Sequence, residues 1–152
     1  MSDNIFEALR ESHERQRSLC TRVVRSKPGS EAREALFQAV KIELEAHAAA
    51  EERFLYSPIL MHDNGLTPSR HALSEHHEIE ELLEEMSVHD KGTESWQDKA
   101  ASLSHTVRHH LKEEETSFFQ QAGKLLTEQQ KATLAGRYRR DFERMKKVLA
   151  AG

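Results

Sequence analysis

A repeated spacing of histidine and glutamate constrains this 152-residue chain more than any other feature of its sequence. Three pairs of polar residues stand 63 positions apart: His13 with His76, His47 with His110, and Glu51 with Glu114. Each pair joins two residues of the same type, so the first half of the chain and the second half carry the same polar pattern. Such a repeat predicts two similar helical hairpins that contribute equally to one two-fold site.

The local spacing around these residues is that of an α-helix. His110 and Glu114 are four positions apart, so both project from one helical face, in line with Val107 and Phe118. An imidazole and a carboxylate on an otherwise apolar face are costly to bury unless something pairs with them. The repeat together with this burial cost indicates a metal site inside the protein.

The composition favours an all-α fold. The chain is rich in Ala, Leu, Glu, Lys and Arg and has only 6 Gly and 3 Pro, which suits helices. We expect a single domain over residues 1–152, because this length can bury a sizeable core. Aromatic residues make up 6% of the chain, so aliphatic side chains have to supply most of that core.

Capping residues and breaks predict the helix boundaries. The first helix begins at Asp3 or Asn4 and ends at Lys27-Pro28-Gly29, and the second runs from its cap at Ser30 to Pro58. A loop with Asn64-Gly65 turn chemistry follows, and Thr67 caps the third helix with Pro68 at its first position. Thr93 or Ser95 begins the fourth helix, and Thr127 with Gln130 forms a capping box for the fifth.

These boundaries predict a specific architecture. Short connections make neighbouring helices antiparallel, so we expect an up-down-up-down four-helix bundle over about residues 3–125. The additional C-terminal helix, about residues 128–150, carries none of the repeat and is expected outside or beyond the bundle.

The six repeated residues are the predicted metal ligands: His13, His47, Glu51, His76, His110 and Glu114. Two ions about 3.5 Å apart would each take two histidines and share both glutamates as bridges. The repeat assigns His13 and His47 to one ion and His76 and His110 to the other. Imidazole and carboxylate without thiolate suit iron, with manganese or zinc possible.

The other six histidines, Cys20 and Glu43 are interpreted as surface residues or as structural support for the site. We expect the other six histidines at the surface, His71 at the rim of the site and the rest solvated: His62, His77, His89, His105 and His109. Cys20 is interpreted as a buried apolar thiol, about 10 Å along its helix from His13. Glu43 lies one turn before His47 and either holds the second nitrogen of that imidazole or caps the solvent end of the site.

The motifs resemble those of the hemerythrin-like, or HHE cation-binding, family. The resemblance runs from about Asn4 to Ala122 and is carried by Asn4–Leu9 leading to His13, His47–Glu52 followed by Leu55–Pro58, Glu75–Glu78 followed by Leu82-Leu83, and His110–Glu115. Ala72 and Glu80 stand four residues before and after His76, so the chain resembles the four-histidine, two-glutamate members. That resemblance implies a non-haem di-iron centre with an oxo or hydroxo bridge, held by the same six residues.

The resemblance leads to functional expectations. A di-iron protein of this kind binds or reacts with dioxygen, peroxide or nitric oxide, as a sensor or in peroxide detoxification, and the sequence does not say whether it is an enzyme. Iron storage, donation or sensing is the alternative, and a metal-free helical adaptor is a third interpretation. We expect no nucleic-acid partner because the net charge is −4.

The sequence also gives expectations on location and assembly. We expect no membrane association, because no apolar run approaches the roughly 20 residues that a span needs. A single cysteine and an acidic N-terminal stretch without signal-peptide features suit the cytoplasm. The oligomeric state, monomer or homodimer, stays open.

Overall fold

The structure, a computed structural model, describes residues 3–152, and each regular element across that range is helical. The helices are α1 (Ile5–Arg25), α2 (Glu31–Glu51), α3 (Ser57–Leu60), α4 (Leu66–Met86), α5 (Glu94–Glu113), α6 (Phe119–Leu125) and α7 (Glu128–Ala151). A π-helical turn, η1 (Glu52–Tyr56), joins α2 to α3, and a second, η3 (Glu114–Phe118), joins α5 to α6. Each of these joined pairs runs as one continuous helix, so the prediction of an all-α fold is confirmed.

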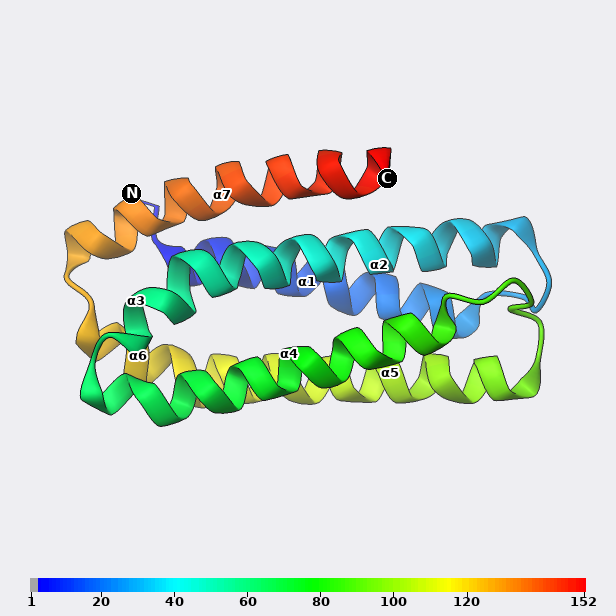
Figure 1. The fold of residues 1–152 in the computed structure, drawn as a ribbon, viewed down its shortest axis with the longest axis horizontal. Coiled ribbons are helices and arrows are strands. Elements are labelled where there is room, and N and C mark those ends of the chain that lie inside the picture. The colour runs from blue at the N-terminus through cyan, green and yellow to red at the C-terminus, as the bar shows by residue number, and fades with distance from the viewer. Residues whose placement is uncertain (1–2) are drawn as a thin grey trace.

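Four helices form an antiparallel bundle, with α1 beside α2 and α5, and α4 beside α5 and α2. The predicted up-down-up-down order is therefore confirmed (Figure 1). The additional helix α7, coloured orange to red in Figure 1, packs along the outside of α1 and α2. None of the helices over residues 3–152 is both long and apolar enough to cross a membrane.

Most of the predicted helix starts are confirmed by side-chain caps. The side chains of Asn4, Ser30, Thr93 and Thr127 each accept a hydrogen bond from a backbone N–H three residues later. Thr127 and Gln130 also complete the predicted capping box, because the Gln130 side chain accepts from the backbone N–H of Thr127. These caps satisfy donors that the first turn of a helix leaves unpaired.

The predicted end of the second helix at Pro58 is wrong. The chain continues as helix through η1 and α3 to Leu60, and Pro58 lies in the first turn of α3. Proline is tolerated at that position because the first N–H groups of a helical segment have no partner within it. The π turn η1 ends at Tyr56, directly before this segment, so Pro58 lies where the hydrogen-bond register of the helix changes and the helix continues.

The prediction for the next connection is also wrong in part. Residues Asp63–Gly65 form a short 3-10 turn, η2, and α4 begins at Leu66 without the Thr67 cap. Gly65 has φ of −94°, which any residue adopts. Glycine is required there for a different reason, since a Cβ at this position would overlap the backbone carbonyl oxygen of Ile59.

The apolar core is divided into two clusters. One includes Leu9, Leu55 and Phe118, and the other includes Phe37 and Leu103. Along each of the four bundle helices, the repeated histidines and glutamates fall between residues of the first cluster and residues of the second. The fold thus places the polar residues in mid-bundle, with apolar packing on either side.

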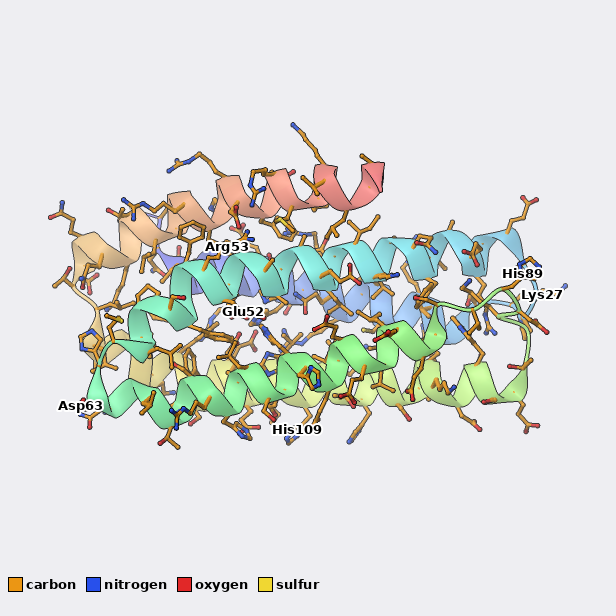
Figure 2. The ribbon with its side chains drawn as sticks, viewed as in Figure 1. Lys27, Glu52, Arg53, Asp63, His89 and His109 are labelled. Atoms are coloured by element: carbon orange, nitrogen blue, oxygen red, sulfur yellow. The ribbon has the colours of Figure 1, made fainter. Side chains whose placement is uncertain are left out.

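A buried arginine closes one end of the bundle. Arg33 is 1% exposed, and its guanidinium donates to the backbone oxygens of Ser26 and Lys91 and to the side chain of Gln97. It therefore ties together the two connections that meet at this end, where Figure 2 labels Lys27 and His89. Asp63 lies at the opposite end.

Candidate metal centre

The six residues that the repeat selected converge inside the bundle. Their exposed fractions lie between 0% and 7%: His13 on α1, His47 and Glu51 on α2, His76 on α4, His110 on α5, and Glu114 at the start of η3. Six polar side chains in an apolar interior carry a large desolvation cost unless they are paired. Their contacts therefore decide what the site can do.

The six residues fall into two overlapping groups. His13, His47, Glu51 and Glu114 can bring one nitrogen or oxygen each within 4.8 Å of one another, and so can His76, His110 and the same two glutamates. The imidazoles are therefore grouped in space as the repeat predicted. Each group offers two imidazoles and two carboxylates. These are ligands that a five-coordinate or octahedral cation accepts, with one or two positions left for other ligands.

Both carboxylates lie between the two groups. Glu51 Oε1 is 3.2 Å from His47 Nε2 and 3.1 Å from His76 Nε2. Glu114 places Oε1 3.1 Å from His13 Nε2 and Oε2 3.7 Å from His110 Nε2. A carboxylate that reaches imidazoles of both groups is placed to bridge two ions.

The outer nitrogens of His13 and His76 are held by two glutamates that the 63-residue repeat relates to each other. His13 Nδ1 is 2.7 Å from Glu115 Oε2, and His76 Nδ1 is 2.9 Å from Glu52 Oε2. Glu52 and Glu115 are themselves 63 positions apart, so the repeat extends to these partners. An ionised carboxylate only accepts hydrogen bonds, so it fixes the proton on Nδ1 and leaves the Nε2 lone pair free when the ring is neutral.

The other two imidazoles are held differently. His110 Nδ1 is 2.8 Å from Glu75 Oε1. The residue 63 positions before Glu75 is Ser12, whose side chain is too short for the equivalent contact. Tyr138 of α7 bridges the gap, because its hydroxyl lies 2.7 Å from both Ser12 Oγ and His47 Nδ1. The fifth helix thus completes the half of the site that the repeat leaves unfinished.

Three of the four inner nitrogens and two carboxylate oxygens have no hydrogen-bond partner of good geometry. The buried unpaired atoms in this region are His13 Nε2, His47 Nε2, His110 Nε2, Glu51 Oε2 and Glu114 Oε1. Buried polar atoms are normally paired, so a cluster of unpaired atoms that face one another fits an ion between them. An outer hydrogen bond on Nδ1 with an inward Nε2 is also how metal-binding histidines are usually held.

The pKa values of the imidazoles show which histidines carry a proton beside the buried glutamates when no ion is bound. Burial alone would lower the pKa of His13, but Glu114 and Glu115 raise it to about 9. The pKa of His76 is raised in the same way to about 10. Burial lowers the pKa of His47 to about 4. Cations that bind here must displace the protons on His13 and His76, because a ligating imidazole is neutral.

A comparison with protein families shows which family this chain belongs to. The family model described as the hemerythrin HHE cation binding domain matches residues 4–122. The chain belongs to this hemerythrin HHE cation-binding domain family. The family likeness expected from the motifs is thereby confirmed, and His/Glu clusters able to hold metal lie within the matched residues.

Two individual proteins are similar to this HHE chain. A hemerythrin HHE cation binding domain-containing protein from Mycobacterium kansasii has the same fold, with a TM-score of 0.85 and 21% sequence identity over 95% of this chain and 88% of that one. A protein from Nostoc sp. strain PCC 7120 described as a DNA nickase is 28% identical over 116 residues. That match covers 76% of this chain but 32% of the Nostoc protein, so the HHE chain spans about a third of that relative's length.

Tyr56 is a site residue that the sequence interpretation missed. Its hydroxyl lies 3.0 Å from Glu51 Oε1 and also contacts Glu114 Oε2, so these two carboxylates share its single proton, and it lies 3.3 Å from His76 Nε2. Glu51 and Tyr56 are five residues apart, a spacing that shares a face in a π turn but not in an α-helix. The turn η1 therefore aims the phenol into the centre of the HHE site.

The position equivalent to Tyr56 in the second half is Phe119, which makes the two halves chemically different. The Phe119 ring stacks on His13 with 5.7 Å between centroids, and Phe118 packs edge-on against Tyr56. One side of the HHE site is therefore covered by an apolar ring, while a hydroxyl lies at the other.

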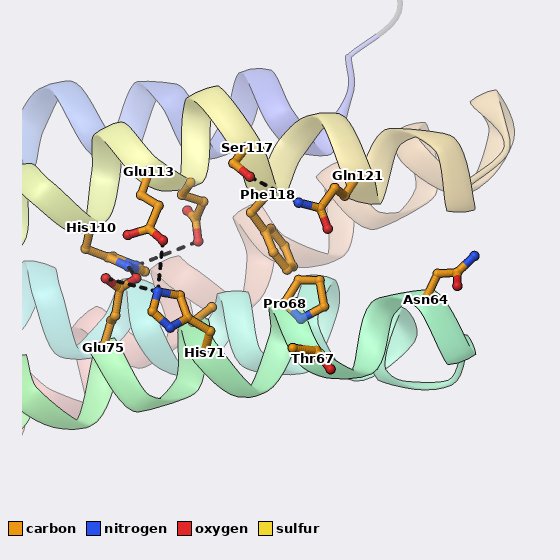
Figure 3. A pocket seen from close by; sticks show the side chains of 12 residues that line it. Asn64, Thr67, Pro68, His71, Glu75, His110, Glu113, Ser117, Phe118 and Gln121 are labelled. Atoms are coloured by element: carbon orange, nitrogen blue, oxygen red, sulfur yellow. Dashed lines mark hydrogen bonds and ion pairs between the residues drawn. The ribbon is translucent and has the colours of Figure 1, made fainter.

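A cavity of about 420 Å³ opens beside the second group. Of the six predicted ligands, His110 and Glu114 line it within the described residues 3–152. Thr67, Pro68 and Gln121 also line it, and Figure 3 shows them on the side away from His110 and Glu75. The cavity gives this half of the HHE site a connection to the protein surface.

The structure also places the other candidate residues, which are Glu43, Cys20 and the six remaining histidines. Glu43 does not hold the second nitrogen of His47, because Tyr138 occupies that place; its carboxylate pairs with Arg15 at 3.3 Å and Lys146 at 3.6 Å instead. This leaves the other alternative, in which Glu43 caps the solvent end.

The five histidines expected to be solvated are exposed: His62, His77, His89, His105 and His109. Cys20 is buried, and His71 lies at the cavity rim, as expected.

Proposed function

We propose that this HHE protein is a non-haem di-iron protein that binds or reacts with dioxygen, peroxide or nitric oxide. The six converging residues are the proposed ligands: His13, His47, Glu51, His76, His110 and Glu114. One observation carries the proposal: all four imidazoles are held through Nδ1 while their Nε2 atoms face two shared carboxylates. Each proposed ion would take two imidazoles and share both glutamates.

The donor set favours iron over the other candidates. Imidazole and carboxylate without thiolate suit iron, and manganese and zinc are the next choices. Two iron ions at this place would supply the one-electron redox chemistry that dioxygen, peroxide and nitric oxide require. The residues of the chain would orient these small molecules and keep bulk water away, because apolar clusters lie on either side.

Tyr56 is the residue placed to hold a proton inside the site. Burial and the charges of Glu114 and Glu51 raise the pKa of the Tyr56 hydroxyl well above its usual value, so it stays protonated at neutral pH. If Glu51 and Glu114 held ions, these carboxylates would no longer need the phenol proton, and Tyr56 could donate it in a hydrogen bond to a small ligand on the side of His76. We propose that Tyr56 orients the bound molecule through this hydrogen bond.

The cavity is the proposed route for small ligands. It reaches His110 and Glu114 and is lined partly by Ala72 and Phe118, which suits a small, weakly polar molecule. The first group is covered by Phe119 and Tyr138. We therefore propose that small ligands would enter the site beside His110 before they reach the side of His13 and His47.

The expectations on partners and location are retained as part of this proposal. The nickase activity named for the Nostoc protein belongs to a chain of which the match covers only 32%. The net charge of −4 does not favour binding to nucleic acid. A cytoplasmic location is proposed from the single buried cysteine.

Iron analysis combined with an optical spectrum tests the proposal. Protein produced with iron should hold two iron ions per chain and show near-ultraviolet charge-transfer bands that change when peroxide is added. A colourless protein with less than one iron ion per chain would contradict the proposal. Iron that leaves readily to a chelator on reduction, without any consumption of peroxide, would favour the alternative of iron storage or donation.

The chain offers a matched control for this experiment. His76 and His77 are neighbours on α4, but His76 is 7% exposed and faces the site, while His77 is exposed and pairs with Glu81 at 2.7 Å. H76A should lose iron and the optical bands, and H77A should keep both. Equal iron contents in the two variants would show that the buried imidazole is not a ligand.

A further inference from the structure

We propose that a divalent cation binds at a separate rim site formed by His71, Glu75 and Glu113, and that cations enter the central cluster through it. The binding of this cation stands independently of the proposed function, whereas the entry role rests on it. The rim site lies at the mouth of the 420 Å³ cavity and is distinct from the six central residues.

The geometry of the rim site already resembles that of a cation site. His71 Nε2 is 2.9 Å from Glu113 Oε1 and 3.6 Å from Glu75 Oε2, and one donor atom from each residue lies within 4.8 Å of the others. In Figure 3 the three side chains come from facing helices, α4 and α5, and point toward one another. One imidazole and two carboxylates are a sufficient protein ligand set for zinc or iron, with water in the remaining positions.

The charge of the cavity favours a cation. Glu75, Glu113 and Glu114 all line it, and none of its described lining residues is Lys or Arg. The side chains of His71, Glu75 and Glu113 are 57%, 12% and 38% exposed, so an ion can reach them from water while one carboxylate is largely shielded. A cleft lined by one sign of charge raises the local concentration of the opposite ion.

Glu75 connects the rim site to the central cluster. Its Oε2 faces His71, while its Oε1 lies 2.8 Å from His110 Nδ1. His110 Nε2 and Glu114 Oε1 belong to buried side chains that line the same cavity, and both atoms lack a hydrogen-bond partner. Glu75 therefore contacts both the rim residue His71 and His110, whose Nε2 is one of the unpaired atoms of the central cluster.

The other exposed histidine–glutamate pairs do not share these features. His77 with Glu81 on α4, and His109 with the rim residue Glu113 on α5, are each a pair of residues four apart on one helix. Such a pair forms on any solvated helix and contributes little. The rim site instead draws ligands from two helices and opens onto a cavity, which makes the His77–Glu81 pair a suitable control.

Zinc stoichiometry by equilibrium dialysis tests the binding. The metal-free 152-residue protein is dialysed against Zn²⁺, and the double variant H71A/E113Q is compared with wild type and with the control H77A/E81Q. Wild type and control should each bind one more zinc ion per chain than H71A/E113Q. Equal stoichiometry in all three proteins would overturn the rim site.

This design separates failure of the rim site from failure of the central cluster. If the central cluster binds no metal, wild type should hold a single zinc ion and H71A/E113Q none. If the rim site is wrong, H71A/E113Q should hold as many ions as wild type. Anomalous diffraction at the zinc edge then gives a second readout, with a peak between His71 and Glu113 expected in wild-type crystals.

The entry role has its own test in the rate of loading. The transfer of Zn²⁺ from a chromogenic chelator to the central cluster should be several-fold slower in H71A/E113Q than in wild type or H77A/E81Q, with the same final central occupancy. The substituted residues are not among the proposed central ligands, so the end point should not change. An unchanged rate would overturn the entry role.

Discussion

The hydroxyl of Tyr138 lies 2.7 Å from Nδ1 of His47 and joins the fifth helix to the candidate metal centre. The same hydroxyl is 2.7 Å from Ser12 Oγ, so it replaces the carboxylate that Glu75 provides in the other half. Helix α7 packs along α1 and α2. It is therefore part of the site's support, although it carries none of the repeat.

Removing this hydroxyl should weaken metal binding without unfolding the protein. Y138F keeps the ring but leaves His47 Nδ1 without its partner, and outer hydrogen bonds of this kind are worth roughly 10–100-fold in metal affinity. Competition with a chelator measures the change. The control F142L replaces the ring stacked on Tyr138 with a smaller aliphatic side chain. It should lower the melting temperature while metal affinity stays near wild type. Equal affinity in Y138F and wild type would contradict the role of Tyr138.

The glutamates behind His13 and His76 should act on different halves of the site. E115Q removes the charge beside His13, and E52Q removes the charge beside His76. Each should reduce the affinity for one of two ions, again by roughly tenfold or more. Stepwise titration of the metal-free protein with Zn²⁺ would show one weakened step in each variant. Loss of both steps together in either variant would argue against two separate ions.

Tyr56 should stabilise the metal-free protein. Its hydroxyl contacts both Glu51 and Glu114 and offers them one proton, so Y56F removes the donor that these two buried carboxylates share. Loss of a partner by a buried polar group costs about 1–3 kcal/mol. Urea unfolding of metal-free Y56F and wild type measures the free energy of unfolding, and an unchanged value would contradict the contact.

The glycine at the start of α4 should be intolerant of substitution. In G65A the new Cβ would overlap the backbone carbonyl oxygen of Ile59, and overpacking of this kind costs about 1–3 kcal/mol. Gly123, within α6, is the matched control, because its Cβ would meet only Phe6 at 3.8 Å. G123A should be neutral or stabilising by up to about 1 kcal/mol, since alanine favours helix. Equal melting temperatures for G65A and G123A would contradict the packing at Gly65.

The single thiol should react slowly in the folded protein. Burial raises the pKa of Cys20 to about 11 from its usual value of 9.0, so at pH 8 the reactive thiolate is scarce and shielded. Alkylation by iodoacetamide should be slow at pH 8 and rise as the pH approaches 11. Protein unfolded in urea is the control and should react quickly at pH 8. Equally fast alkylation of folded and unfolded protein would show that Cys20 is accessible.

The convergence of the six polar residues was predictable because it depends on two regular spacings. The four-residue spacing puts His47 with Glu51 and His110 with Glu114 on one helical face, and the 63-residue offset relates the two hairpins. The same offset relates Glu52 to Glu115, so the glutamates behind His76 and His13 also belong to the repeat.

Other parts of the site were not predictable from spacing. Tyr56 reaches Glu51 only because η1 is a π turn, and sequence periodicity of 3.6 residues places the two on different faces. Tyr138 lies on a helix outside the repeat, so its contact with His47 depends on how α7 packs. Proline predicts a helix end at position 58, and the π turn that precedes Pro58 has no sequence signature of its own.

The most direct test of the central claim is an anomalous difference map at the iron edge from crystals of the iron-loaded protein. The account predicts two peaks, one between His13 and His47 and one between His76 and His110, with Glu51 and Glu114 reaching both. Iron-loaded crystals without peaks inside the bundle, or with iron bound only at surface histidines, would contradict it.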